Sequence, residues 1–375
     1  MSSVIDESSV TFNRFNPKEK LKKRRILIRP YTYLTDSIGK DSLKMSILLS
    51  LQILMLLITR SYQAVFVILA SVSASIIANF INYYLQSSFE IEDHFSFSIS
   101  FVQGVIVGML LPQNYPPVTV FFATLFTMLI VKYMFGGYAH AWVNPSVCAV
   151  AVMWIIGSSL FPDYLVNYDL LSMRNPSQIM IEGGVFPVYK FDSVITDFLN
   201  NTIFGVLKFS LPEGYVSLFW DTGSVIPAFR FNLLTLLSSI VIFNDDIVKY
   251  FISIAFLLVY MILVRYISPL FFGAMDIKGD ILLALLTGGT LFASTFVIGW
   301  YGTNPMTIPG KLIYGSLAGI SCFFISGCGT SPCGMVFTVV TVNIISVVIQ
   351  QIETQYDRKR LEKVIAKREA LENVN

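Results

Sequence analysis

Charged residues are scarce in this sequence. Lys, Arg, Asp and Glu make up 13% of its 375 residues, whereas a soluble globular chain carries about a quarter. Hydrophobic residues make up 54%, and the mean hydropathy is +0.67. This balance excludes a disordered chain, a nucleic-acid-binding protein and an ordinary cytosolic enzyme, and it indicates a protein that lies in a lipid bilayer.

Cysteine and histidine are scarce as well. Four cysteines are too few for a disulfide framework, and the absence of a CxxC motif, with only His94 and His140 as histidines, argues against a zinc site. Cys328 and Cys333 stand five residues apart in SGCGTSPCGM. This spacing allows a small disulfide, two free thiols, or a metal or iron–sulfur site completed elsewhere, and the first two are favoured. His140 lies among aromatic residues and is expected to be an interfacial anchor rather than a proton relay.

Basic residues are concentrated at the two ends of the sequence. Residues 1–30 hold eight Lys and Arg and residues 354–375 hold six, which together are 14 of the 26 in the chain. The first 40 residues are polar, so we expect no secretory signal peptide there. By the positive-inside rule both ends are expected in the cytoplasm, which requires an even number of membrane spans.

The apolar segments predict an all-α polytopic membrane protein of about ten transmembrane helices, because a span needs about 20 mostly apolar residues. The segments 97–111 and 312–327 are short and Gly-rich, which indicates broken or re-entrant helices inside a bundle of two repeats. The expected spans are 43–60, 63–85, 97–111, 118–135, 143–161, 227–244, 247–266, 281–299, 312–327 and 335–350.

Three regions follow from this pattern. We expect a cytoplasmic basic N-terminal segment at 1–42, a transmembrane domain at 43–353 and a charged cytoplasmic tail at 354–375 that forms a helix with charge pairs. Within the domain, residues 162–225 are rich in Asp, Asn, Gly and Pro and are expected to form an ordered extracytoplasmic loop or small cap. A loop of this length is usually functional.

Two stretches place Asn-Pro after a Gly/aromatic turn and before an apolar run. They are GGYAHAWVNPSVCAVAV, with Asn144, and GWYGTNPMTIPGKLIYG, with Asn304. Asn is a good helix cap and Pro suits the first turn, so each pair is expected to start a helix whose positive end points at a buried site. The alternative is two ordinary helix starts.

These stretches resemble a known family: the D-type membrane component of the Rnf electron-transport complex and its relative, the B-type component of the sodium-pumping NADH:quinone oxidoreductase. The resemblance is strong at 97–150 and 279–345 and weak between 162 and 230. The matching pieces are Phe135-Gly136-Gly137, Asn144-Pro145-Ser146, Leu110-Leu111-Pro112, Thr303-Asn304-Pro305-Met306-Thr307-Ile308-Pro309 and Gly310-Lys311-Leu312-Ile313-Tyr314-Gly315, with Gly319, Gly327, Gly334 and Asn343 further on.

The resemblance implies a covalent FMN, esterified to a Thr of a Ser-Gly-Ala-Thr-type motif in the loop between the fifth and sixth spans. This sequence lacks the motif. Thr196 lies near the acceptor position, but Asp197 beside it would repel a phosphodiester, and Thr202 is the other candidate. Arg230 could meet the flavin phosphate. Covalent attachment is therefore doubtful for this chain.

The implied function is that of a membrane subunit of an ion-translocating electron-transport complex, which relays electrons through flavin coupled to Na⁺ or H⁺ transport. The implied setting is the bacterial cytoplasmic (inner) membrane, with iron–sulfur and flavoprotein subunits as partners and no nucleic acid. Riboflavin in the bundle is a further implied cofactor, with Asn144, Asn304 and Thr307 as its supports. The alternatives are a solute or ion transporter and a flavin-free structural subunit on the same scaffold.

Ionisable residues near apolar runs are further candidates, because charge inside a membrane is costly. Most stand near a span end, where their side chains are expected to reach water. They are Lys132, Arg230, Asp245, Asp246, Lys249, Asp276 and Asp280.

Overall fold

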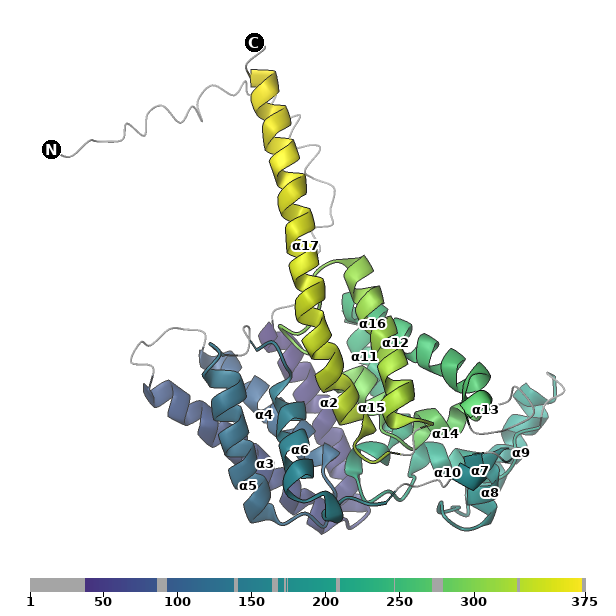
Figure 1. The fold of residues 1–375 in the computed structure, drawn as a ribbon. Coiled ribbons are helices and arrows are strands. Elements are labelled where there is room, and N and C mark those ends of the chain that lie inside the picture. Colours follow the sequence, from purple (N-terminus) through teal and green to yellow (C-terminus); the bar gives the residue numbers. More distant parts are fainter. Residues whose placement is uncertain are drawn as a thin grey trace, which may run out of the picture. The chain divides into compact units, whose positions relative to one another are not determined.

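The computed structural model describes residues 38–85, 93–137, 141–163, 168–171, 173, 175–206, 210–245, 247–271, 279–328 and 331–372. All of them belong to one compact unit. Every regular element in this part of the chain is a helix, as expected for an all-α protein (Figure 1). His140, Asp246 and Asp276 lie outside the described residues.

Two groups of helices, separated by a cap, make up the unit. The first group is α2 (Ile38–Ile58), α3 (Tyr62–Leu85), α4 (Asp93–Leu110), α5 (Pro117–Thr127) with the π-helix η3 (Met128–Tyr133), and α6 (Pro145–Ile156) with η4 (Ser158–Leu160). The second is η6 (Pro227–Phe229), α11 (Asn232–Asp245), α12 (Ile247–Tyr266), α13 (Ser268–Phe271), α14 (Ile281–Leu286), α15 (Thr290–Phe292), η7 (Ala293–Val297), α16 (Ile308–Ser326) and α17 (Gly334–Glu372).

Membrane-spanning helices are confirmed in kind, although the number ten stays a prediction. Four helices are long and apolar enough to cross a bilayer: α2, α3, α16 and the first part of α17. Shorter apolar helices lie at Phe97–Leu110, Pro117–Tyr133, Pro145–Ile156, Asn232–Asn244 and Tyr250–Tyr266.

Paired glycines let helices pack closely in both groups. A Cβ atom on Gly104 or Gly108 of α4 would lie 2.6 or 2.5 Å from the backbone of α3. Gly315 and Gly319 of α16 meet backbone atoms of α12 in the same way, at 2.5 and 2.9 Å. Small residues four apart let backbones approach in membranes, where no hydrophobic effect drives association.

The expectation that 97–111 and 312–327 are broken helices is therefore wrong. Both segments lie in continuous helices, α4 and α16, because their glycines form flat contact surfaces rather than breaks. The break falls instead in the segment 281–299, which divides into α14, α15 and η7. Gly289 separates the first two pieces with φ +69°, and the ring of Phe229 occupies the space that a Cβ there would need.

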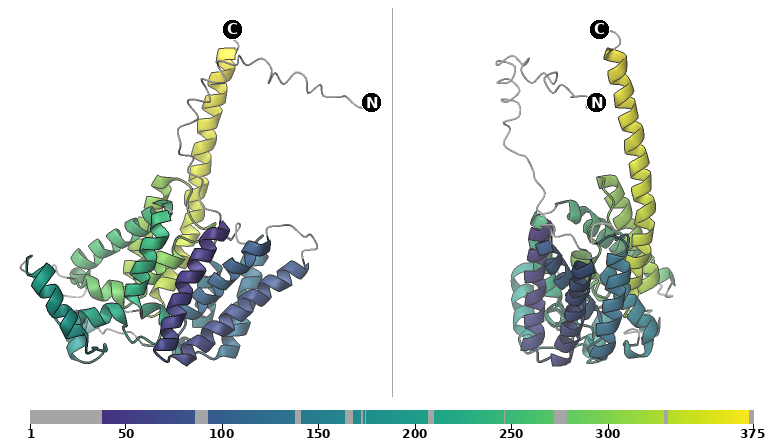
Figure 2. Two further views of the ribbon diagram at one scale, coloured as in Figure 1. Left: turned by 180° about the vertical axis from the view of Figure 1, so that it is seen from behind. Right: turned by 90° about the vertical axis from the view of Figure 1, so that its left-hand side faces the viewer.

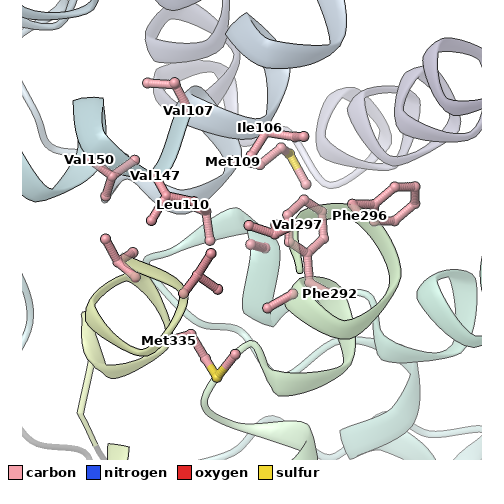
Figure 3. Close-up of a cluster of buried hydrophobic side chains, with 14 of the residues drawn as sticks. Ile106, Val107, Met109, Leu110, Val147, Val150, Phe292, Phe296, Val297 and Met335 are labelled. Atoms are coloured by element: carbon pink, nitrogen blue, oxygen red, sulfur yellow. The ribbon is translucent and has the colours of Figure 1, made fainter. Parts of the chain in front are cut away.

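An apolar cluster joins the two groups of helices. Its side chains come from α4 and α6 on one side and from α15, η7 and α17 on the other, and all are almost fully buried (Figure 3). The labelled members are Ile106, Val107, Met109, Leu110, Val147, Val150, Phe292, Phe296, Val297 and Met335.

The cap is an ordered helical segment, as expected for 162–225. It contains α7 (Tyr168–Leu171), α8 (Pro176–Glu182), α9 (Asp192–Leu199), the π-helix η5 (Asn200–Phe204) and α10 (Tyr215–Trp220). Its own apolar cluster includes Met180, Phe186 and Leu218 and extends to Leu283 and Leu286 of α14. The cap is thus fixed to the second group of helices.

The last helix continues beyond the bundle. α17 has 39 residues, which at 1.5 Å per residue is about 58 Å, longer than the roughly 30 Å of hydrocarbon. Its side chains from Gln351 to Ala366 are nearly all exposed, and Figure 2 shows this part leaving the other helices at the end away from the cap. Arg358 and Glu362 pair at 3.0 Å, which confirms the predicted helix with charge pairs. We call this end of the bundle the tail end.

Candidate functional site

The first Asn-Pro pair starts a buried helix, as predicted. Asn144 is fully buried and is the N-cap of α6, with its Oδ1 accepting the backbone N–H of Ser146 at 3.0 Å and Pro145 in the first turn. The Nδ2 of Asn144 donates to the carbonyl of Val297 at 3.2 Å. The start of α6 therefore meets the end of η7, which belongs to the broken segment.

The second Asn-Pro pair does not start a helix, so that prediction is wrong for Asn304. α16 begins at Ile308, with Thr307 as its N-cap accepting from Gly310 N at 3.1 Å. The reason is Glu353 of α17, whose carboxylate accepts from the backbone N–H groups of Met306 and Thr307 and from the Thr307 hydroxyl. Glu353 holds the start of α16 three residues later than the sequence indicates.

The turn between η7 and α16 is held by one face of α17. Asn343 accepts from the Tyr314 hydroxyl at 2.8 Å, and this hydroxyl also reaches the carbonyl of Ile298. Ser346 donates to the Thr303 carbonyl. Gln350 donates to the Asn304 carbonyl at 2.9 Å. Residues 343, 346 and 350 lie on one helix face, so the turn 298–305 is fixed beside the start of α6.

Three buried polar atoms of this junction have no hydrogen-bond partner within the described chain. They are the indole Nε1 of Trp300, the Oδ1 of Asn304 and the Nδ2 of Asn343. A buried polar atom without a partner costs about 1–3 kcal/mol. Two donors and one acceptor are thus left for a bound group. We name Asn144, Trp300, Asn304 and Asn343 the junction site.

Arg230 is already paired with a carboxylate. Its Nε and Nη2 donate to the two oxygens of Asp221 at 2.9 and 2.5 Å, and its Nη1 donates to the Ser61 hydroxyl at 2.6 Å. Burial first, and then the Asp221 carboxylate, raises the pKa of Tyr189, which donates to Asp221 at 3.3 Å. The guanidinium therefore ties the 221–230 turn to the turn between α2 and α3.

The two threonine candidates in the cap differ in access. Thr196 in α9 is 1% exposed, and its hydroxyl donates to Asp192 Oδ1 at 3.1 Å. Thr202 in η5 is exposed, and its hydroxyl donates to the Phe198 carbonyl at 2.6 Å. The free surface at the expected acceptor position therefore belongs to Thr202.

A buried carboxylate organises the cap. Asp192 accepts from Gly214 N at 2.7 Å, from Ser217 N at 2.5 Å and from Thr196 Oγ1, so it joins α9 to the start of α10. Burial alone would raise the pKa of Asp192, but the hydrogen bonds from Ser217, Gly214 and Thr196 outweigh it and lower the pKa below its ordinary value.

Replacing Asp192 with Asn is expected to loosen the cap by about 2 kcal/mol, because an amide NH₂ would face N–H donors. Since the pKa is lowered in the folded chain, this stabilisation is present above the ordinary value of about 3.9 and is lost as the pH falls below it. Amide hydrogen exchange at Gly214 and Ser217, corrected for intrinsic rates, measures it. Asp197→Asn, on the exposed face of the same helix, should change nothing. Equal exchange in wild type and D192N at pH 7 would contradict the assignment.

The cysteines carry free, buried thiols. Cys328 and Cys333 form no disulfide, and burial raises their pKa values to about 11 and about 12. Within the described ranges, no group of three or more His, Cys, Asp and Glu side chains could hold a metal ion. The free-thiol alternative thus describes this pair.

A pocket of about 160 Å³ lies between the cap and the helix ends. Its lining includes Phe186, Thr222, Ser224 and Ser331 but none of the residues expected from the sequence. Small-molecule pockets usually begin at roughly 300 Å³. The pocket is therefore smaller than a typical cofactor site.

The sequence reasoning missed Trp300, Asn343, Glu353 and Asp221. Asn343 was noted only as part of the family resemblance, and the acidic residue after the last apolar run was the available signal for Glu353. Trp300 and Asp221 gave no signal of their own, because their roles depend on contacts with distant segments.

Comparison with known proteins gives consistent relatives, all of them the D component of an ion-translocating oxidoreductase complex. That of Shewanella pealeana is 24% identical over 263 residues, covering 64% of this chain and 71% of the relative. That of Tolumonas auensis is 23% identical over 300 residues, covering 74% and 81%. That of Haemophilus ducreyi is 21% identical over 263 residues, covering 65% and 72%. Because the model of the NQR2, RnfD, RnfE family matches residues 26–358, the chain belongs to this family.

Proposed function

We propose that this chain, as the membrane subunit of an Rnf/Nqr-type ion-translocating oxidoreductase complex, relays electrons through a flavin held at the junction site, coupled to Na⁺ or H⁺ transport. The observation that carries the proposal is the set of three unpartnered buried polar atoms at Trp300, Asn304 and Asn343. The names of the relatives support the kind of complex.

The polar atoms of the junction site fit a flavin. Trp300 and Asn343 offer N–H donors for ring carbonyls, and Asn304 offers an acceptor for a ring N–H. Trp300 and Tyr301, with ring centroids 5.3 Å apart, provide an aromatic wall. The positive end of α6 at Asn144 favours negative charge nearby. A bound flavin supplies one- and two-electron transfer, and the chain supplies position and electrostatics.

We infer that this flavin, FMN or riboflavin, is held without a covalent bond. Thr196 does not fit as an acceptor, because its hydroxyl is buried and donates to Asp192. Thr202 is accessible, so it is the position to examine if a covalent flavin is found. The charge of Arg230 is matched by Asp221, which leaves it poorly suited to bind a flavin phosphate.

We place the cap outside and the tail end in the cytoplasm of a bacterial inner membrane, with ten passes between residues 43 and 353. The basic residues in the two terminal segments support this orientation. The exposed part of α17 then reaches into the cytoplasm, where flavoprotein or iron–sulfur subunits of the complex can contact it.

Two substitutions test the junction site in the purified complex. Trp300→Phe keeps an aromatic ring and removes one donor, and Asn304→Ala removes the acceptor. Each should weaken flavin binding about tenfold, since one hydrogen bond contributes about 1–1.5 kcal/mol. The flavin-to-protein ratio after washing, taken from the visible spectrum, measures the loss. Ser346→Ala is the matched control, because it removes a bond to the same turn without touching an unpartnered atom.

The other outcomes decide between the alternatives. Flavin fluorescence in a denaturing gel would contradict non-covalent binding, and its loss in Thr202→Val would locate the bond. If the wild-type protein binds no flavin of either kind, the electron-relay proposal fails and a transporter or a structural subunit is favoured.

A further inference from the structure

Lys132 is buried in the membrane domain without a carboxylate partner. The residue lies in η3 and is 1% exposed, which overturns the expectation that its side chain reaches water. Its Nζ donates to Ser100 Oγ at 3.0 Å and to Gln103 Oε1 at 2.8 Å, both on α4. The ring of Tyr133 lies 4.8 Å from Nζ. The described residues contribute no acid to this group.

Such an arrangement is costly unless it has a use. A buried ammonium loses its hydration, and only neutral oxygens and one aromatic ring replace it here. Ionisable side chains inside membrane helices usually mark ion or proton pathways. The π-helix that carries Lys132 is a local irregularity of a kind often found at functional sites.

Hydroxyl groups continue from Lys132 towards the tail end. Ser100 Oγ lies 3.5 Å from the Tyr133 hydroxyl, and this hydroxyl donates to Asn79 Oδ1 of α3 at 2.8 Å. Tyr133 is half-buried, so its phenol can exchange a proton with solvent.

In the opposite direction, polar groups lead to the junction site. The backbone carbonyl of Gln103 accepts from Ser146 Oγ of α6 at 3.1 Å, and Ser146 N is bonded to Asn144. The Nε2 of Gln103 is buried and has no partner among the described groups. Lys132 thus stands between the tail end of the bundle and the start of α6.

The groups that face Lys132 are few. α4 contributes Ser100 and Gln103, η3 itself contributes Tyr133, α3 contributes Asn79 beyond Tyr133, and α6 contributes Ser146 beyond Gln103. Tyr133 is the titratable one among them, so a proton on Lys132 has an exchange partner but no fixed counter-charge.

We propose that Lys132 is a proton-binding group that compensates charge at the junction site, which rests on the proposed function of that site. Lys132 releases its proton when an N–H bond breaks as an O–H bond forms at Ser100, whose original proton passes to the Tyr133 oxygen. The phenol proton of Tyr133 passes to water. Reversal of these transfers loads Lys132 again, and no electron moves to or from these residues.

The test is proton uptake on chemical reduction of the purified complex, followed with a pH dye in unbuffered solution. Lys132→Met should lower the uptake by about one proton per complex, because one group is lost. Lys132→Arg should lower it equally, since arginine keeps the charge but does not release its proton. A merely structural or electrostatic role predicts wild-type uptake in K132R, and that result overturns the proposal.

A second pair of variants keeps the test valid if Lys132 variants fold poorly. Tyr133→Phe and Ser100→Ala leave Lys132 in place but interrupt the hydroxyl path, so uptake should become at least about tenfold slower with the same final extent. Unchanged rates in both variants overturn the path. Flavin content is measured in the same samples. A flavin-free wild type overturns the proposed function, whereas normal flavin with unchanged proton uptake in K132M overturns the role of Lys132 alone.

Discussion

Replacing Gly315 with leucine is expected to destabilise the second group of helices by about 3 kcal/mol or more, because the new side chain cannot fit between two backbones. A Cβ at this position would already lie 2.5 Å from the carbonyl oxygen of Ile252 and 2.9 Å from the Cβ of Ala255. α16 would have to move away from α12, and the junction site depends on α16 through Tyr314.

Thermal unfolding in detergent, followed with a thiol-reactive dye, measures this effect. Cys322, Cys328 and Cys333 are buried and become reactive when the helices separate. Ile320→Val on the exposed face of the same helix is the control and should stay within about 0.5 kcal/mol of wild type. A wild-type melting temperature in G315L would show that α12 and α16 are not in close contact.

Hydropathy predicted where most helices lie, because a bilayer forces apolar residues into long hydrogen-bonded helices. The expected segment 63–85 is α3 to within a residue, and 247–266 coincides with α12. The break at Gly289 was not predictable, since it depends on the ring of Phe229 from a distant turn. The same limit applies to glycine itself. Its presence marked α4 and α16 as unusual, but only the packed partner shows that it serves contact there.

The candidate site was predictable in part. Local chemistry predicted the cap at Asn144, because Asn and Pro act on their own helix start. The start of α16 was not predictable in the same way, since Glu353 is 46 residues from Thr307 along the chain. The sequence also placed Lys132 in an apolar run, but whether it faced lipid, water or protein depended on the neighbours of η3.

Removing one partner of the Asp221–Arg230 pair is expected to be the most destabilising change near the cap. The Asp221 side chain is 1% exposed and that of Arg230 is 11% exposed. Arg230→Met would leave a buried carboxylate without its cation, which typically costs about 3–5 kcal/mol. The bond to Ser61 would be lost as well, so the turn between α2 and α3 would separate from the 221–230 turn. Thermal unfolding with the thiol-reactive dye measures the loss.

The double variant Asp221→Asn/Arg230→Met separates this pairing from a cofactor role. Since it removes both charges together, it should recover part of the stability that R230M loses. Flavin content, taken from the visible spectrum of folded protein, should stay at the wild-type level in the double variant, because the junction site draws on other residues. If flavin is lost in a double variant that melts like wild type, Arg230 binds the flavin after all, and its pairing with Asp221 is only what the guanidinium does when no phosphate competes for it.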